Sequence, residues 1–208
     1  MTDATAKARI DRALVDLVGQ HGYEQTSIEQ ICERARVPIN EFEGLYADKK
    51  DCLERVWERM TVDYICSCKG AYMERESWRD GLRAAGYAAL DWLFEDEART
   101  RFFLIEVMAG GEMVRAHRDH MMSEFIEMLD GGRLASGRPE DFGHGTAEGL
   151  TGAVYDNAIE SIKRREGLPE ARQRVKKVMY VVVVTYLGAE AAAEELRTPA
   201  PGEPPPSP

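Results

Sequence analysis

Apolar residues recur every three or four positions along most of the chain, and the strict alternation that is typical of strands is absent. A period of three to four residues indicates helices that bury one face. The first such stripe lies in residues 4–21 and consists of Ile10, Leu14, Leu17 and Val18. The pattern therefore predicts an all-α protein.

Helix start and stop signals divide this pattern into elements. Gly22 ends the first helix, because glycine adopts the positive φ angle that a helix end often needs. Thr26 followed by Glu29 predicts a capping box that opens a short second helix. A short third helix is expected to begin at Pro38, and Asp48 is expected to cap a longer fourth one. Further helices, which bring the total to about nine, are predicted at 77–95, 97–109, 112–135, 143–166 and 169–197.

The second and third helices are short and joined by a tight connection. Together with the long first helix they match a helix-turn-helix, in which the later helix enters the major groove of DNA. Phe42 and Leu45 are expected to face inward from the third helix. Because many three-helix cores share this spacing, it is also compatible with a plain helical bundle.

Composition and charge narrow the class of protein. Of the 208 residues, 44% are hydrophobic and 31% are charged, which is typical of a globular chain. No apolar run approaches the roughly 18 residues of a membrane span, and the N-terminus lacks a signal-peptide pattern, so we expect a cytoplasmic protein and no membrane partner. The net charge of −10 excludes a general nucleic-acid coat, but it permits DNA contact through one small face.

Motifs for catalysis or metal binding are not found. There is no nucleophile elbow, phosphate loop or HExxH sequence, so we expect no enzyme, and we assign no catalytic residue, cofactor or metal. The four cysteines form no CxxC pair and are expected to be free buried thiols.

Two sequence segments resemble the DNA-binding domain of the TetR family of transcriptional regulators. They are HGYEQTSIEQICERARV at 21–37 and DKKDCL at 48–53, and the resemblance covers about 50 residues. It returns at 184–190 (VTYLGAE), which is similar to the closing dimer helix of many members, whereas the middle of the chain matches only in pattern. The resemblance implies a helix-turn-helix domain at 1–52 and a ligand-binding and dimerisation domain at 53–197. Residues 198–208 are rich in proline and are expected to form a disordered tail.

The expected DNA contacts follow from helix starts and from the resemblance. Thr26 and Ser27 place hydroxyls and backbone N–H groups at a helix start, where phosphate binds well. Lys49 and Lys50 begin the fourth helix and are expected to reach phosphate. The resemblance implies that base edges are contacted by Ile39, Asn40, Glu41, Glu43 and Gly44.

The third helix departs from the family pattern. Pro38 replaces a capping Ser or Thr, Glu43 replaces a phosphate-contacting Tyr, and Ile39 stands where a basic residue is common. Residues 24–52 contain four basic and seven acidic residues, and four minus seven gives −3. In one interpretation Asn40 binds an adenine edge while Glu41 or Glu43 accepts from a cytosine amino group. In the other, DNA binding is weakened or lost and the chain is a small-molecule-binding protein.

The larger part of the chain offers surface for a small-molecule effector. Aromatic and methionine side chains suit an adaptable apolar pocket, although each of them could instead belong to an ordinary core. The candidate ligand-binding residues are Tyr64, Trp78, Trp92, Phe103, His117, Met121 and Phe125.

The last two predicted helices suit a homodimer interface. One carries small residues that let a partner helix approach closely, namely Gly149, Gly152, Ala153 and Ala158. The other helix has an apolar face formed by Val178, Val181, Val182, Thr185 and Ala189. Two copies would form a four-helix interface, and a palindromic DNA operator requires such a two-fold dimer. In the alternative interpretation, these faces close the core of a single copy. The expected function is a ligand-responsive dimeric regulator, in the simplest case a repressor that a small apolar or aromatic molecule releases from its operator.

Overall fold

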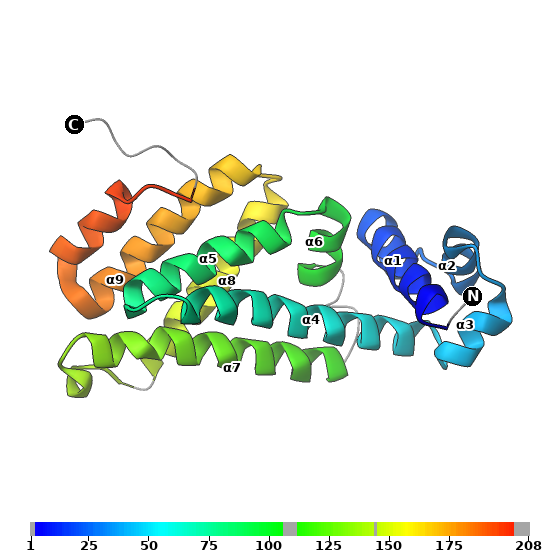
Figure 1. Ribbon diagram of the computed structural model, residues 1–208, viewed down its shortest axis with the longest axis horizontal. Helices are drawn as coiled ribbons and strands as arrows, with labels where there is room; N and C mark the ends of the chain where they lie inside the picture. The colour runs from blue at the N-terminus through cyan, green and yellow to red at the C-terminus, as the bar shows by residue number, and fades with distance from the viewer. Residues whose placement is uncertain (1–2, 106–111, 144, 202–208) are drawn as a thin grey trace. The chain divides into compact units, whose positions relative to one another are not determined.

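The computed structural model describes residues 3–105, 112–143 and 145–201, and in these ranges the chain forms α-helices and no strand (Figure 1). The helices are α1 (Asp3–His21), α2 (Ile28–Ala35), α3 (Ile39–Leu45), α4 (Lys49–Met73), α5 (Trp78–Leu93), α6 (Glu97–Leu104), α7 (Glu112–Ala135), α8 (Gly145–Lys163) and α9 (Leu168–Arg197), with a short 3-10 turn at Pro139–Asp141. The all-α prediction is confirmed. Residues 106–109 of the predicted sixth helix and most of the proline-rich tail lie outside the described residues.

The chain divides into two compact units. Unit 1 comprises Met1–Asp63 and Leu93–Asp119, and unit 2 comprises Tyr64–Trp92 and His120–Pro208. Helices α4 and α7 each contribute to both units. The predicted boundaries at residues 52 and 197 stay predictions. None of the helices in the described ranges is long and apolar enough to cross a membrane.

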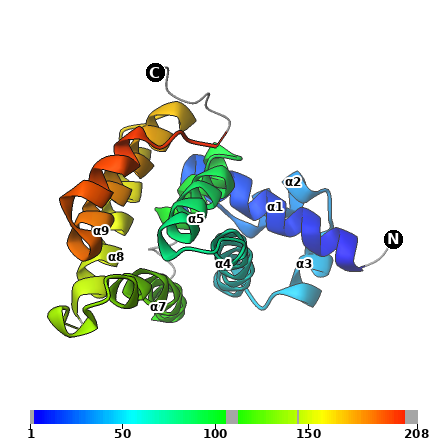
Figure 2. The ribbon, with the colours of Figure 1, turned by 60° about the vertical axis from the view of Figure 1, so that its left-hand side comes forward.

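Unit 1 is built around α1, which contacts α2, α3 and α6. Figure 2 shows α2 and α3 beside α1. The apolar stripe predicted from the sequence forms its core, because Ile10, Leu14 and Val18 have no exposed surface. Phe42 of α3 is equally buried. Helix α6 approaches α1 very closely at Gly19, where a Cβ atom would overlap the backbone carbonyl of Ala98.

Unit 2 has an apolar core formed largely by α7, α8 and α9. The ring of Tyr186 on α9 lies 5.5 Å from that of Trp78 and 5.0 Å from that of Phe142, measured between centroids. Leu129 and Val182 complete this cluster. Aromatic contacts of this kind add to the stabilisation that apolar burial already provides.

The predicted continuous last helix is wrong in one respect, because α9 is kinked at Gly188. The φ angle of Gly188 is 84°, in the left-handed region that favours glycine, and the chain turns back there (Figure 1). The returning segment places Glu195, which is 1% exposed, against α5. Its carboxylate accepts hydrogen bonds from Arg83 at 2.8 Å and pairs with Arg79 at 3.0 Å. These ion pairs hold the end of the helix on α5.

Three further findings refine the sequence-based expectations. Cys66 is exposed, so the prediction of four buried thiols is wrong at this position, whereas all four cysteines are free. In the tail, residues 198–201 are described and Ala200 is buried. Among the described residues, no three His, Cys, Asp or Glu side chains are grouped to hold a metal ion.

Candidate nucleic-acid interface

Helices α2 and α3 are joined by a turn whose geometry follows from three residues. Arg36 ends α2 in the left-handed region with a φ angle of 55°, and its backbone N–H donates to the carbonyls of Cys32 and Glu33. Val37 is buried, which fixes the turn on the core of unit 1. Pro38 then precedes α3 and offers no side-chain cap, as the sequence indicated. The result is a helix-turn-helix with a short second helix.

The outward face of α3 carries four of the five residues predicted to read bases. Phe42 points inward and is fully buried, so the opposite side of the helix faces solvent. The exposed residues are Ile39, Asn40, Glu43 and Gly44, whereas Glu41 is half-buried. Ile39 is 46% exposed although it is apolar, and a Cβ atom at Gly44 would meet nothing within 4 Å. This face combines an amide, a carboxylate and an apolar side chain with room for close approach.

The start of α2 differs from its prediction. The capping box is formed by Ser27 and Gln30, not by Thr26 and Glu29. The Thr26 hydroxyl is buried and donates to the Gly22 carbonyl at 2.9 Å. Ser27 is half-buried and accepts from the backbone N–H of Gln30 at 3.3 Å. Of the two hydroxyl residues predicted to contact phosphate, Thr26 is buried and Ser27 is partly accessible.

The two lysines at the start of α4 have different surroundings. The Lys49 ammonium donates to the carbonyls of Tyr23 at 2.9 Å and Thr26 at 2.7 Å, and it lies 4.1 Å from the centre of the Tyr23 ring. It therefore holds the α1–α2 connection against α4. Lys50 is exposed and lies 3.6 Å from the carboxylate of Glu54.

A polar network that the sequence analysis did not identify supports this region. The phenol of Tyr46, just after α3, donates to Asp11 on α1. Arg59 of α4 pairs with the same carboxylate at 2.5 Å and donates to the Tyr46 oxygen at 3.2 Å. Burial, together with the hydrogen bond to Asp11, raises the pKa of Tyr46 well above its usual value. The network joins three elements, and the only sequence signal for it was an acidic residue beside the apolar stripe of α1.

Two of the predicted ligand residues surround Trp57 in unit 1. The ring of Phe103 stacks on Trp57 with centroids 5.6 Å apart, and the His117 ring lies at 6.3 Å. Nε2 of His117 is 3.7 Å from a Glu58 oxygen, while its Nδ1 is buried with no hydrogen-bond partner among the described residues. The hydroxyl of Thr61, one turn after Trp57, is likewise buried with no hydrogen-bond partner among the described residues.

The other predicted ligand residues lie in unit 2. Tyr64 contacts Trp92 and Phe125, with ring centroids at 5.0 and 5.7 Å. Burial raises the pKa of Tyr64 well above its usual value. Met121 is buried. Trp78 belongs to the core around Tyr186 instead and donates from its indole N–H to the Met128 carbonyl at 2.8 Å.

The predicted dimer faces are partly open in the single copy. Cβ atoms at Gly149 and Gly152 on α8 would meet nothing within 4 Å. On α9, Val181 is 50% exposed, and Thr185 and Ala189 are exposed as well. Val182 is different, because it is buried in the core of unit 2. The assignment of Val182 to the dimer face is therefore corrected to a core position.

Comparisons with solved structures identify the fold. The fatty acid degradation regulator FadR from Bacillus halodurans superposes with a TM-score of 0.73 at 15% identity, over 85% of this chain and 93% of that one. FadR from Bacillus subtilis in complex with stearoyl-CoA gives 0.70 at 14% identity, over 85% and 97%. A TetR family regulator from Marinobacter aquaeolei VT8 gives 0.67 at 15% identity, over 85% and 95%. No protein-family model and no curated protein sequence matches the chain. The fold is that of a helical transcription regulator, and specifically it is the TetR-family regulator fold.

Proposed function

We propose that this chain is a dimeric transcription regulator that reads DNA with α3 and responds to a small molecule. The observation that carries the proposal is the outward face of α3, which presents Asn40 and Glu43 to solvent on a helix anchored by the buried Phe42. A short helix held in this way at the end of a helix-turn-helix suits the major groove.

The chemistry of α3 supports base reading with few phosphate contacts. An asparagine amide can donate to and accept from an adenine edge, and a carboxylate can accept from the amino group of cytosine. The methyl groups of Ile39 suit contact with a thymine methyl group. The lack of a side chain at Gly44 lets the helix approach the groove closely.

A two-fold dimer through α8 and α9 would supply the second reading head. The slim surface at Gly149 and Gly152 lets a partner helix approach closely, and the exposed Val181 provides apolar area. In this arrangement each half of a palindromic operator meets one copy of α3.

The effector in this proposal is an apolar or aromatic molecule. Within unit 1, the rings of Trp57 and Phe103 offer apolar groups, and the Nδ1 of His117, which has no hydrogen-bond partner among the described residues, offers a polar anchor. The stearoyl-CoA of Bacillus subtilis FadR makes acyl compounds a reasonable first class to examine. An effector that favours one state by a few kcal/mol would shift the regulator away from its DNA-bound state, as in a repressor.

A small-molecule-binding protein without DNA activity is the second candidate. It is favoured by the −3 charge of residues 24–52 and by Lys49, whose ammonium is engaged with backbone carbonyls. Both features reduce the attraction of this surface to a polyanion.

Selection of bound DNA from a random pool, with and without acyl-CoA, separates the two candidates. We expect a palindromic motif, and footprinting should show two half-sites. The variant Asn40→Ala should relax the preference at one base pair of each half-site by about 1–3 kcal/mol. Gln25→Ala, at an exposed position before α2, is the matched control and should leave the motif unchanged. Failure to enrich any motif would favour the second candidate, and an unchanged motif with Asn40→Ala would exclude Asn40 as a base-reading residue.

A further inference from the structure

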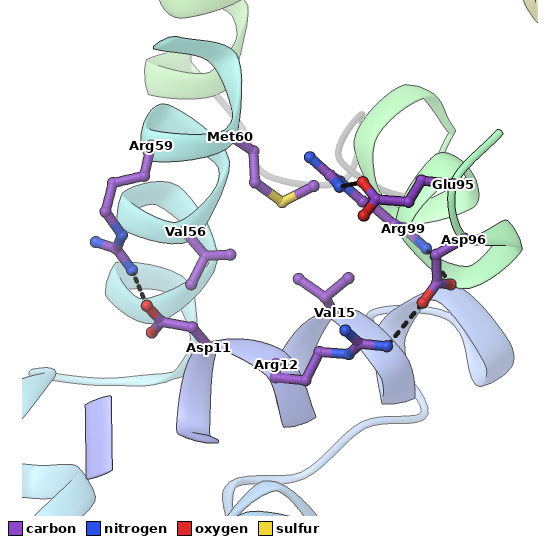
Figure 3. A pocket seen from close by; sticks show the side chains of 9 residues that line it. All are labelled: Asp11, Arg12, Val15, Val56, Arg59, Met60, Glu95, Asp96 and Arg99. Atoms are coloured by element: carbon purple, nitrogen blue, oxygen red, sulfur yellow. Dashed lines mark hydrogen bonds and ion pairs between the residues drawn. The ribbon is translucent and has the colours of Figure 1, made fainter. Parts of the chain in front are cut away.

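Unit 1 contains a cleft that shares no residue with the predicted effector site. It has a volume of about 470 Å³ and lies between α1, α4 and the start of α6 (Figure 3). This volume is within the range of roughly 300–1,000 Å³ that small-molecule sites occupy. The lining residues are Asp11, Arg12, Val15, Val56, Arg59, Met60, Glu95, Asp96 and Arg99.

The cleft has an apolar floor between two charged walls. Val15, Val56 and Met60 lie in the middle, as Figure 3 shows. On one side Arg59 pairs with Asp11 at 2.5 Å. On the other side, the ion pairs are Arg12 with Asp96 at 2.8 Å and Arg99 with Glu95. An occupant would therefore meet hydrocarbon along its length and both signs of charge at each end.

The lining contains three guanidinium groups and three carboxylates, so both kinds of group stand on both walls. Beyond the lining, Lys7, Asp16 and Asp63 also pair with Asp11, Arg12 and Arg99. A ligand with only one sign of charge would cover the other kind of group without bonding to it, which is unfavourable. A ligand that carries one positive and one negative group can bond to both kinds of side chain. The guanidinium groups are accessible for this, since the side chains of Arg12 and Arg59 are 69% and 43% exposed.

We propose that this cleft is a second small-molecule site, for a zwitterion with an apolar body such as a short apolar peptide. The ligand carboxylate would accept from the guanidinium groups, its ammonium would donate to the carboxylates, and its apolar part would cover Val15 and Met60. Burial of the apolar part supplies affinity, and the paired charges supply selectivity. The site lies outside the proposed effector pocket, and its occupation does not require DNA.

Calorimetric titration of the full chain with the dipeptide leucyl-leucine tests the charge requirement. The N-acetylated dipeptide lacks the ammonium group and the C-terminal amide lacks the carboxylate, so each should bind about tenfold more weakly or worse. The doubly blocked dipeptide should bind weakest of the four. Equal affinity for all four, or no binding of leucyl-leucine, would overturn the proposal.

The location of binding is tested on the unaltered chain by NMR of methyl-labelled methionines. The Met60 methyl signal should move on addition of leucyl-leucine, whereas the signal of Met73, which is 76% exposed and lies in unit 2, should stay in place. A shift confined to other methionines would place the ligand elsewhere and contradict the proposed site.

Filling the cleft provides a second test of location. Met60→Trp should abolish binding of leucyl-leucine, because the indole would occupy the floor of the cleft. Val62→Trp is the matched control, since Val62 is 58% exposed on the same helix and does not line the cleft. Urea unfolding of both variants establishes that they are folded, and retained binding by folded Met60→Trp would exclude the cleft.

Discussion

At the scale of single residues, Lys49 and Lys50 show how neighbouring side chains of the same type differ in role. Lys49 satisfies two backbone carbonyls of the α1–α2 connection, whereas Lys50 points to solvent near Glu54. The sequence placed both lysines at a helix start but could not assign these partners. The carbonyls that Lys49 contacts lie 26 and 23 residues away in the chain, and only the folded structure brings them close.

We expect Lys49→Met to lower the free energy of unfolding by about 1–3 kcal/mol, because two part-buried carbonyls lose a charged donor. Lys50→Met should change it by less than about 0.5 kcal/mol, as is usual for exposed positions. Urea unfolding followed by circular dichroism measures both values. Equal losses for the two variants would contradict the structural role of Lys49.

Glu194 and Glu195 form a second pair of neighbours with different burial. Glu195 is 1% exposed and pairs with Arg79 and Arg83, and its hydrogen bonds with Arg83 raise the pKa of Arg83 above its usual value. Glu194 pairs with Arg79 from a side chain that is 50% exposed.

Glu195→Gln should therefore destabilise the chain by about 3–5 kcal/mol, because Arg79 and Arg83 lose the buried carboxylate that they share. Glu194→Gln should cost no more than about 1 kcal/mol, since exposed ion pairs contribute little. Thermal unfolding of the two variants under the same conditions compares them. Similar melting temperatures would show that Glu195 is not the anchor of the returning segment.

At the scale of helices, the apolar stripes and capping residues predicted most of the elements. The stripe of Ile10, Leu14 and Val18 marks the buried side of α1, and all three residues are fully buried. Choosing between Thr26 and Ser27 as the cap was beyond the sequence, because both have a Glu or Gln three residues later and only the burial of Thr26 decides. The kink at Gly188 was missed because a glycine within a helical pattern does not reveal whether its φ angle is positive.

The close contact between α1 and α6 gives a prediction at this scale. Gly19→Ala should destabilise unit 1 by about 1–3 kcal/mol, because the added methyl group overlaps the Ala98 carbonyl and forces the helices apart. Gly70→Ala lies within α4 at a position where a Cβ atom would meet nothing within 4 Å, and it should instead stabilise the chain by up to about 1 kcal/mol. Denaturant unfolding measures both changes, and a neutral Gly19→Ala would show that the two helices can separate without cost.

At the scale of the whole molecule, net charge limits how the chain can meet DNA. The total is −10, and the segment that carries the reading helix is itself negative. Of the four basic residues between 24 and 52, Lys49 holds backbone carbonyls and Arg34 pairs with Asp16 at 3.2 Å. Arg36 and Lys50, whose ion pair with Glu54 is longer at 3.6 Å, are left for phosphate, which gives four such contacts in a dimer. Composition predicted this limit, but the engagement of Lys49 emerges only from the structure.

We therefore expect a shallow dependence of operator affinity on salt. The slope of log affinity against log salt concentration should be about −4 for the dimer, because each phosphate contact contributes roughly −0.9. Fluorescence anisotropy over a series of salt concentrations measures it. A slope twice as steep would show that other basic residues reach the DNA backbone, and Lys50→Met should reduce the magnitude by about 2 for the two copies.

The reversal of the chain at Gly188 has a consequence for biosynthesis. Glu195 lies 112 residues after Arg83, so during translation Arg79 and Arg83 are made long before the buried carboxylate that they contact. Contacts of such long sequence separation form late. The returning segment of α9 therefore docks on α5 late in folding, and a chain that stops at Gly188 would leave Arg83 with Asp80 as its remaining ion-pair partner among those described.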